Sequence, residues 1–139
     1  MSTTSESAPR STAEFVRGVD FVGIPTRDLR AASAFYGGVL GLPRSVYMED
    51  RHFSEYETGN LTLSVYNAEK MGMQHEPNPN PVALHVDDVA ATRKMLEERG
   101  VQFHGDTIDT GVCHMAVFAD PDGNTLMLHH RYAPRQTDT

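Results

Sequence analysis

Residues 19–42 read VDFVGIPTRDLRAASAFYGGVLGL, and residues 81–101 read PVALHVDDVAATRKMLEERGV. Both stretches follow one plan: a short alternating segment leads to an aspartate, and an amphipathic segment with a 3.6-residue apolar period follows. Aligning Asp28 with Asp88 brings Gly41 against Gly100 when one gap is allowed. Aspartate is a good helix N-cap, and glycine commonly follows the last helical residue. The chain is therefore predicted to be an internal duplication, with a strand and a helix opening each half.

The two halves also end alike. GNLTLSVY at 59–66 resembles GNTLMLHH at 123–130, where Gly-Asn precedes a strand-like alternation. Two further strands fit between helix and final strand, at about 45–49 and 52–57 in the first half and 101–104 and 112–119 in the second. The predicted fold class is α+β, with two tandem βαβββ modules. Their predicted bounds are 17–67 and 81–132, joined by a proline-rich linker at 68–80 and flanked by flexible tails at 1–16 and 133–139.

Composition excludes several classes of protein. A net charge of −7, from 12 basic and 19 acidic residues, repels a phosphate backbone and argues against a nucleic-acid partner. No apolar run approaches the roughly 20 residues needed to cross a bilayer, so no membrane partner is expected. The N-terminus MSTTSESAPRSTAEF has no apolar core of a signal peptide. Cys113 is the single cysteine and can form no intrachain disulfide, which fits a cytoplasmic protein.

These motifs together resemble the vicinal oxygen chelate superfamily, which includes glyoxalases, bleomycin-resistance proteins and extradiol dioxygenases. The resemblance rests on the Asp-opened helices, FYGGVLGLP at 35–43, the second copy and the DPDGN turn at 120–124, and it covers about residues 18–132. It implies two curved four-stranded sheets around a ligand cavity. In each module the last strand would lie parallel to the first. It also implies a homodimer with the cavity near the subunit interface.

Alternation along the strands assigns a face to each side chain. In the first and last strand of each module, one face is wholly Leu or β-branched, which predicts that it lies under the helix. The mixed face is predicted to line the cavity and to bind a small organic molecule. The candidate ligand-binding residues are Phe21, Thr62, Ser64, Tyr66, Ala83, His85, Cys113, Met115, Met127, His129 and Arg131.

The resemblance also implies where a metal would bind, at one position on the first and last strand of each module. In this sequence the four positions are occupied by Phe21, Thr62, Pro81 and Met127. A hard divalent ion needs oxygen or imidazole donors, and this set offers one hydroxyl. We therefore expect no metal and no other cofactor. A two-residue shift on the last strand would exchange Met127 for His129, so a divalent metal held by His85 and His129 stays the alternative.

The leading functional hypothesis is metal-independent binding, either sequestration or a conversion without metal, as in the bleomycin-resistance branch. If the protein is an enzyme, His85 and His129 are the candidate catalytic residues, because histidine exchanges protons near neutral pH. By the expected pairing, His85 would lie diagonally close to His129 and beside Arg131, while His114 would point away from the cavity. Cys113 is interpreted as a small buried thiol, with a nucleophile as the alternative. The competing functions are a metal-dependent lyase, isomerase or dioxygenase, and a scaffold without chemistry.

Overall fold

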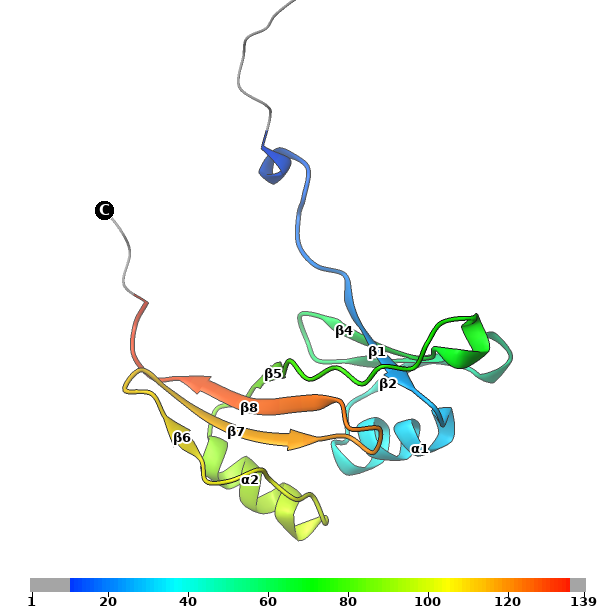
Figure 1. Cartoon of the computed structure of the whole chain (residues 1–139). Coiled ribbons are helices and arrows are strands. Elements are labelled where there is room, and N and C mark those ends of the chain that lie inside the picture. Colours follow the sequence, from blue (N-terminus) through cyan, green and yellow to red (C-terminus); the bar gives the residue numbers. More distant parts are fainter. Residues whose placement is uncertain (1–10, 136–139) are drawn as a thin grey trace, which may run out of the picture.

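The structure is a computed structural model that describes residues 11–135 (Figure 1). Two four-stranded sheets, with orders β1-β4-β3-β2 and β5-β8-β7-β6, form its two halves. The strands of the first sheet are β1 (Phe21–Thr26), β2 (Arg44–Met48), β3 (Phe53–Glu57) and β4 (Thr62–Asn67). Those of the second are β5 (Val82–His85), β6 (Ile108–Asp109), β7 (Cys113–Ala119) and β8 (Thr125–Arg131). β1 is parallel to β4 and β5 to β8, while the other pairs are antiparallel. The predicted pair of βαβββ modules is confirmed.

Each module has one main helix where the sequence predicts it. α1 (Leu29–Ser33) and α2 (Val89–Glu98) begin after Asp28 and Asp88. The Asp28 carboxylate accepts hydrogen bonds from two backbone N–H groups, and that of Asp88 accepts one. Gly41 and Gly100 follow the helices with φ of 70° and 92°, a conformation that glycine adopts at low cost. Three short 3₁₀ turns complete the helices: η1 (Thr12–Glu14), η3 (Glu49–Arg51) and η4 (Glu69–Met71).

The first helix departs from the regular α-helix that its period predicts. From Ala34 it continues as a π-helix, η2 (Ala34–Val39), in which the Leu40 amide bonds the Phe35 carbonyl at 2.8 Å. A π-helix bonds residue i to residue i+5 instead of i+4, and apolar spacing over so short a segment does not distinguish the two windings. The adjacent Phe35 and Tyr36 rings are buried edge to face, with centroids 5.3 Å apart.

The strand predicted at 101–104 is wrong. Phe103 forms a single bridge with Phe118, and the edge strand is the later β6. Two local causes are visible. Phe103 turns its ring onto that of Phe118 at a centroid distance of 5.1 Å, and Gly105 has a φ of 74° that interrupts an extended chain.

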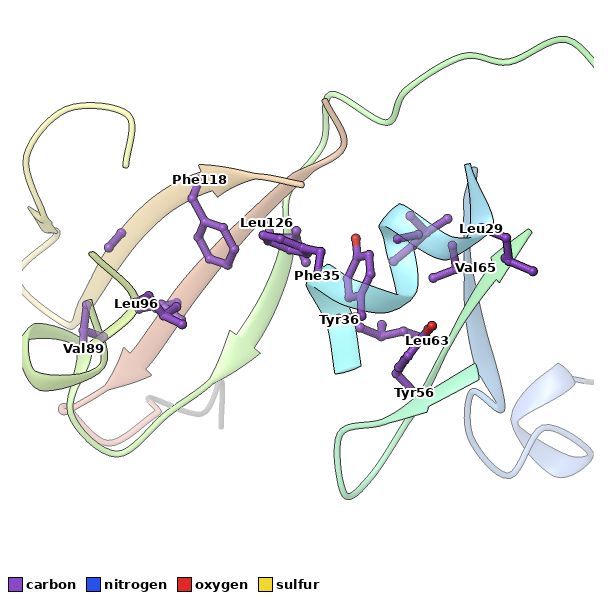
Figure 2. Close-up of a cluster of buried hydrophobic side chains, with 14 residues drawn as sticks. Leu29, Phe35, Tyr36, Tyr56, Leu63, Val65, Val89, Leu96, Phe118 and Leu126 are labelled. Carbon is purple, nitrogen blue, oxygen red and sulfur yellow. The ribbon is translucent and has the colours of Figure 1, made fainter. Parts of the chain in front are cut away.

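One hydrophobic core joins the two modules (Figure 2). α1 and η2 cover the first sheet, and Phe35 also meets Phe118 of β7 at a centroid distance of 6.4 Å. α2 covers the second sheet through Val89 and Leu96. Because the helix of one module packs on a strand of the other, the modules have a defined relative position.

The DPDGN turn at 120–124 joins the modules through polar contacts. The Tyr36 hydroxyl donates to Asp120 Oδ2 at 2.7 Å, and Asn124 Nδ2 donates to the Pro25 carbonyl at 2.8 Å. Asp122 accepts from the Thr26 hydroxyl at 2.5 Å and from the Arg27 amide at 2.9 Å. Asp120 and Asp122 therefore hold the modules together.

The N-terminal segment leaves the body of the molecule as an extended arm on the side opposite α1 and α2 (Figure 1). Val16 and Val19 on this arm are 59% and 66% exposed. Much of the predicted N-terminal tail, and residues 136–139 of the C-terminal one, lie outside the described residues. Within 11–135, no helix combines the length and apolar character of a membrane span.

Candidate functional site

The first sheet has one face under α1. No helix of residues 11–135 covers its other face (Figure 1), which we call the helix-free face. Ile24, Leu63 and Val65 are buried on the helix side, as the alternation predicts. The residues between them point to the opposite side, where the ladder brings predicted site residues together. These pairs are Phe21 with Thr62, Gly23 with Ser64, and Pro25 with Tyr66. The Tyr66 ring lies over Gly23, since a Cβ on that glycine would be 3.2 Å from the ring.

The second sheet brings most of the remaining predicted residues onto its own helix-free face. Leu126 and Leu128 are buried on the helix side, and the alternate positions of β8 point away from α2. The pairs on this face are Ala83 with Met127, His85 with His129, Val117 with Met127, Met115 with His129, and Cys113 with Arg131.

The predicted diagonal placement of His85 and His129 is wrong. The parallel register of β5 and β8 sets the two residues directly side by side. Arg131 follows two residues later on the same face, beyond the end of β5, rather than beside His85. Spacing along one chain does not determine the register between two strands, since a shift keeps the same local pattern.

The histidines differ in exposure and in partners. The side chain of His85 is 73% exposed, and its Nε2 lies 3.8 Å from a carboxylate oxygen of Asp87. His129 is half-buried on the helix-free face. His114 belongs to the other face, where its Nε2 is 3.5 Å from Asp109. His85 and His129 are therefore adjacent and accessible, while His114 points away as expected.

Arg131 carries the least expected feature of this face. Its Nε is buried and has no hydrogen-bond partner within residues 11–135. A guanidinium is always protonated and only donates, so a buried N–H without an acceptor is costly. The neighbouring Cys113 is 8% exposed, and its sulfur lies 3.1 Å from the Thr110 hydroxyl. That surrounding agrees with a buried thiol, and the Arg131 Nε beside it is left without an acceptor in the described chain.

The four positions where the family resemblance implies metal ligands hold poor donors. Phe21 is 59% exposed, Pro81 precedes β5, and Met127 offers a thioether. Thr62 has the one oxygen, and its hydroxyl donates to Glu57 Oε1 at 2.6 Å. Across residues 11–135, no group of three or more His, Cys, Asp or Glu side chains is arranged to hold a metal ion. A metal does not fit this donor set, and the absence of a cofactor stays a prediction.

The first helix-free face also carries two acidic residues, Glu55 and Glu57, that were not predicted as site residues. Glu57 pairs with Thr62 across β3 and β4, and Glu55 pairs with Ser64. Hydrogen bonds from the hydroxyls of Ser45 and Thr62 hold the pKa of the Glu57 carboxyl below its usual value. The alternation in FSEYE at 53–57 was the available signal. The first helix-free face is therefore acidic, whereas the second carries imidazole and guanidinium groups.

A hollow of about 540 Å³ lies between the modules, at a different place from the expected cavity. Its floor includes the buried Leu63, Leu96 and Leu128, which belong to helix-covered faces or to α2. It shares only Ala83 and His85 with the predicted site residues. We call this hollow the intermodule groove. The other predicted residues lie on helix-free faces that a single chain leaves open.

The comparisons with known proteins agree with this architecture. The model of the Glyoxalase/Bleomycin resistance protein/Dioxygenase superfamily matches residues 18–128, and the chain belongs to that superfamily. A search of curated proteins found no match.

Solved structures with the same fold include three relatives of low identity. A glyoxalase/bleomycin resistance protein/dioxygenase from Nocardioides is 19% identical, with a TM-score of 0.72 over 96% of this chain and 93% of that one. Lactoylglutathione lyase from Agrobacterium tumefaciens is 17% identical, with a TM-score of 0.69 over 81% and 92%. TnmS3, an antibiotic binding protein from Streptomyces sp. CB03234, is 24% identical, with a TM-score of 0.71 over 84% and 98%. At these identities the likeness establishes the fold.

Proposed function

We propose that the protein binds a small, mostly apolar organic molecule on the helix-free face of the second module, without a metal ion. The observation that carries the proposal is the buried, unpartnered Nε of Arg131 beside His129 and Cys113. Buried polar atoms in folded proteins nearly always have a partner. An oxygen acceptor of a ligand, such as a carbonyl, phenolate or carboxylate, would satisfy this donor.

The surrounding residues suit such a ligand. Met115, Val117 and Met127 provide apolar contact area on the same face, and methionine adapts to irregular shapes. His85 and His129 add two groups that can donate or accept hydrogen bonds at one end. A mostly apolar surface with a few convergent polar groups is typical of small-molecule sites. Membership of a superfamily with an antibiotic binding protein among its structural neighbours supports sequestration as the role.

Ligand binding is tested with a thermal-shift screen of aromatic ketones, phenols and carboxylates, followed by titration of any hit. Arg131→Gln should weaken binding about 10- to 150-fold, since a hydrogen bond from a charged group is worth about 1.5–3 kcal/mol. Arg135→Gln, an exposed arginine close by, is the matched control and should bind as the natural protein does. Equal affinity of the Arg131 and Arg135 variants would refute this site.

Metal independence has a separate test. Elemental analysis is made on untagged protein purified without chelator, and again after incubation with Zn, Fe, Mn, Ni and Co and desalting. We expect far less than one equivalent of metal. Near-stoichiometric metal that is lost in His85→Ala or His129→Ala would favour the alternative, a lyase, isomerase or dioxygenase with a relocated site. Retention of metal in both variants would place the ion elsewhere and would also contradict the proposal.

Catalysis by His85 or His129 is the enzymatic form of the same proposal. The direct pairing of the two residues supports it, because one imidazole can accept a proton while its neighbour donates a hydrogen bond. A bound compound that is converted by the natural protein and not by His129→Gln would support proton transfer. Binding without conversion would leave sequestration as the function.

A second copy of the chain is proposed to cover the helix-free faces. Glu55 and Glu57 make the first face acidic, while His129 and Arg131 lie on the second, so the first module of one copy suits the second module of another. The exposed Val19 on the arm would be buried in such a homodimer. Light scattering should give the mass of a dimer, and Glu55→Arg should shift it toward a monomer. A natural protein that is monomeric at 0.1 mM would refute dimerisation.

A cytoplasmic location and the absence of nucleic-acid and membrane partners complete the proposal. The single cysteine and the net charge of −7 support these points. Fractionation of cells that express the protein would test the location.

A further inference from the structure

The duplication leaves one end of the contact between the modules closed and the other end open. At the closed end, the Gly123-Asn124 turn reaches into the first module, where buried Asn124 donates to the Pro25 carbonyl. The matching Gly59-Asn60 turn of the first module faces the end of β5. Asn60 is exposed there, and no hydrogen bond joins this turn to β5 or α2 within the described chain. The intermodule groove occupies the place of the missing contact.

The groove has an apolar floor and a polar rim. Its floor and walls are formed by aliphatic side chains from both modules, namely Leu40, Leu42, Leu61, Leu63, Val82, Leu84, Val86, Met95, Leu96 and Leu128. The polar side chains of the lining are those of Thr58, Asn60, His85 and Thr92. A volume of about 540 Å³ lies within the range of pockets that hold small molecules.

The charge of the lining restricts the class of ligand. The lining includes no Asp, Glu, Lys or Arg side chain. Burying a charged group without a partner costs much more than burying a neutral polar one. The hydroxyls of Thr58 and Thr92 already donate to backbone carbonyls, at 2.5 and 2.8 Å, so their lone pairs stay available as acceptors. Asn60 and His85 can supply donors.

From these observations we propose that the intermodule groove is a second ligand site, which takes an uncharged, mostly apolar molecule with one hydrogen-bonding end. The apolar part lies on Leu63, Leu96 and Leu128, and the polar end, a hydroxyl or amide, meets Thr58 and Thr92 at the rim. This site borders the helix-free face that carries Arg131 and shares only Ala83 and His85 with it. The inference does not rest on the function proposed there.

The test uses Nile red, an uncharged dye that brightens in apolar surroundings, titrated into the full chain. Bound dye is then displaced with decan-1-ol or with decanoate, two chains of equal length that differ in charge. We expect decan-1-ol to displace the dye at a concentration at least tenfold lower than decanoate. Equal potency of the two compounds would refute the uncharged ligand class, and absence of dye binding would refute the site.

Substitutions locate the dye. Thr92→Trp and Met95→Trp, on the groove side of α2, should each weaken dye binding at least tenfold by filling the groove. Lys94→Trp, exposed on the same helix and outside the groove, is the matched control and should leave binding unchanged. Met127→Trp on the helix-free face should also leave it unchanged. Loss of binding in Met127→Trp with retention in both groove variants would place the dye on the helix-free face. That result would overturn this inference without touching the proposed function.

Light scattering on the same variants tests for a competing occupant. We expect Thr92→Trp and Met95→Trp to keep the mass of the natural protein. A change of mass in both variants, together with no dye binding to the natural protein, would show that a second copy fills the groove. That outcome would also overturn the inference.

Discussion

Tyr36→Phe is expected to destabilise the protein more than Tyr56→Phe, although both side chains are fully buried and lose the same hydroxyl group. The Tyr36 hydroxyl donates to the carboxylate of Asp120 at 2.7 Å, across the two modules. The Tyr56 hydroxyl shares a 2.9 Å hydrogen bond with the neutral Ser54 hydroxyl two residues away. The two substitutions therefore compare a charged acceptor with a neutral one at matched burial.

The expected magnitudes follow from the acceptors. Asp120 accepts three more hydrogen bonds, from the amides of Asp122 and Asn124 and from Asn124 Nδ2, so removing Tyr36 leaves the carboxylate partly satisfied. A hydrogen bond to a charged group contributes about 1.5–3 kcal/mol, and a neutral one about 0.5–1.5 kcal/mol. Tyr36→Phe should therefore cost about 1 kcal/mol more than Tyr56→Phe.

Urea unfolding at pH 7, followed by circular dichroism, measures both free energies. With a slope of about 1.5 kcal/mol/M, Tyr36→Phe should lower the midpoint by about 1–2 M and Tyr56→Phe by less than about 1 M. In an Asp120→Asn background the extra cost of Tyr36→Phe should shrink, because the charged acceptor is gone. If Tyr36→Phe costs no more than Tyr56→Phe, the contact between Tyr36 and Asp120 does not stabilise the junction between modules.

Three further predictions use the same urea assay. Burial, and then the charge of Asp120, raise the pKa of Tyr36 far above its ordinary value of 10.0. As the pH rises, the unfolded chain therefore loses this proton before the folded protein does. The free energy of unfolding should fall above about pH 10. Tyr36→Phe should reduce that alkaline loss, and an unchanged pH dependence would contradict the argument. Asp28→Ala should cost about 1 kcal/mol and more than Asp88→Ala, since Asp28 caps two N–H groups against one. Gly41→Ala, at a φ of 70°, should cost about 1 kcal/mol, whereas Gly38→Ala, with nothing within 4 Å of the added Cβ, should be neutral or stabilising. A larger cost for Asp88→Ala than for Asp28→Ala would refute the argument from capping. A larger cost for Gly38→Ala than for Gly41→Ala would refute the argument from the backbone conformation.

The fold could be predicted from local sequence patterns. Three signals depend only on neighbours within a few residues. They are the helix caps Asp28 and Asp88, the glycines after the helices, and the alternation on β1, β4, β5 and β8. They were therefore readable from the chain itself. The duplication strengthened each of these signals by repeating it. The edge strand of the second module was misplaced, because the ring contact between Phe103 and Phe118 joins residues 15 positions apart in the numbering.

For the candidate site, the sequence predicted which face of a strand each side chain occupies. It did not predict which residues of neighbouring strands lie side by side. Alternation assigned Met127, His129 and Arg131 to one face of β8, and the structure places them there. The register that sets His85 beside His129 depends on how two strands meet, so spacing along the chain left it open. The same alternation in FSEYE puts Glu55 and Glu57 on one face of β3.

The sequence by itself determined most of the secondary structure, the duplication, and the absence of metal-binding side chains at the four expected positions. Each of these follows from residue type and local order, whereas the π-helix and the edge strand of the second module do not. Only the tertiary structure decided where the polar and apolar surfaces meet. Three features arise from segments that are distant in sequence. They are the closed junction at Asn124, the open intermodule groove at Asn60 and the unpartnered Nε of Arg131. Two copies of one Gly-Asn turn acquired different roles because packing buried Asn124 and left Asn60 at the surface.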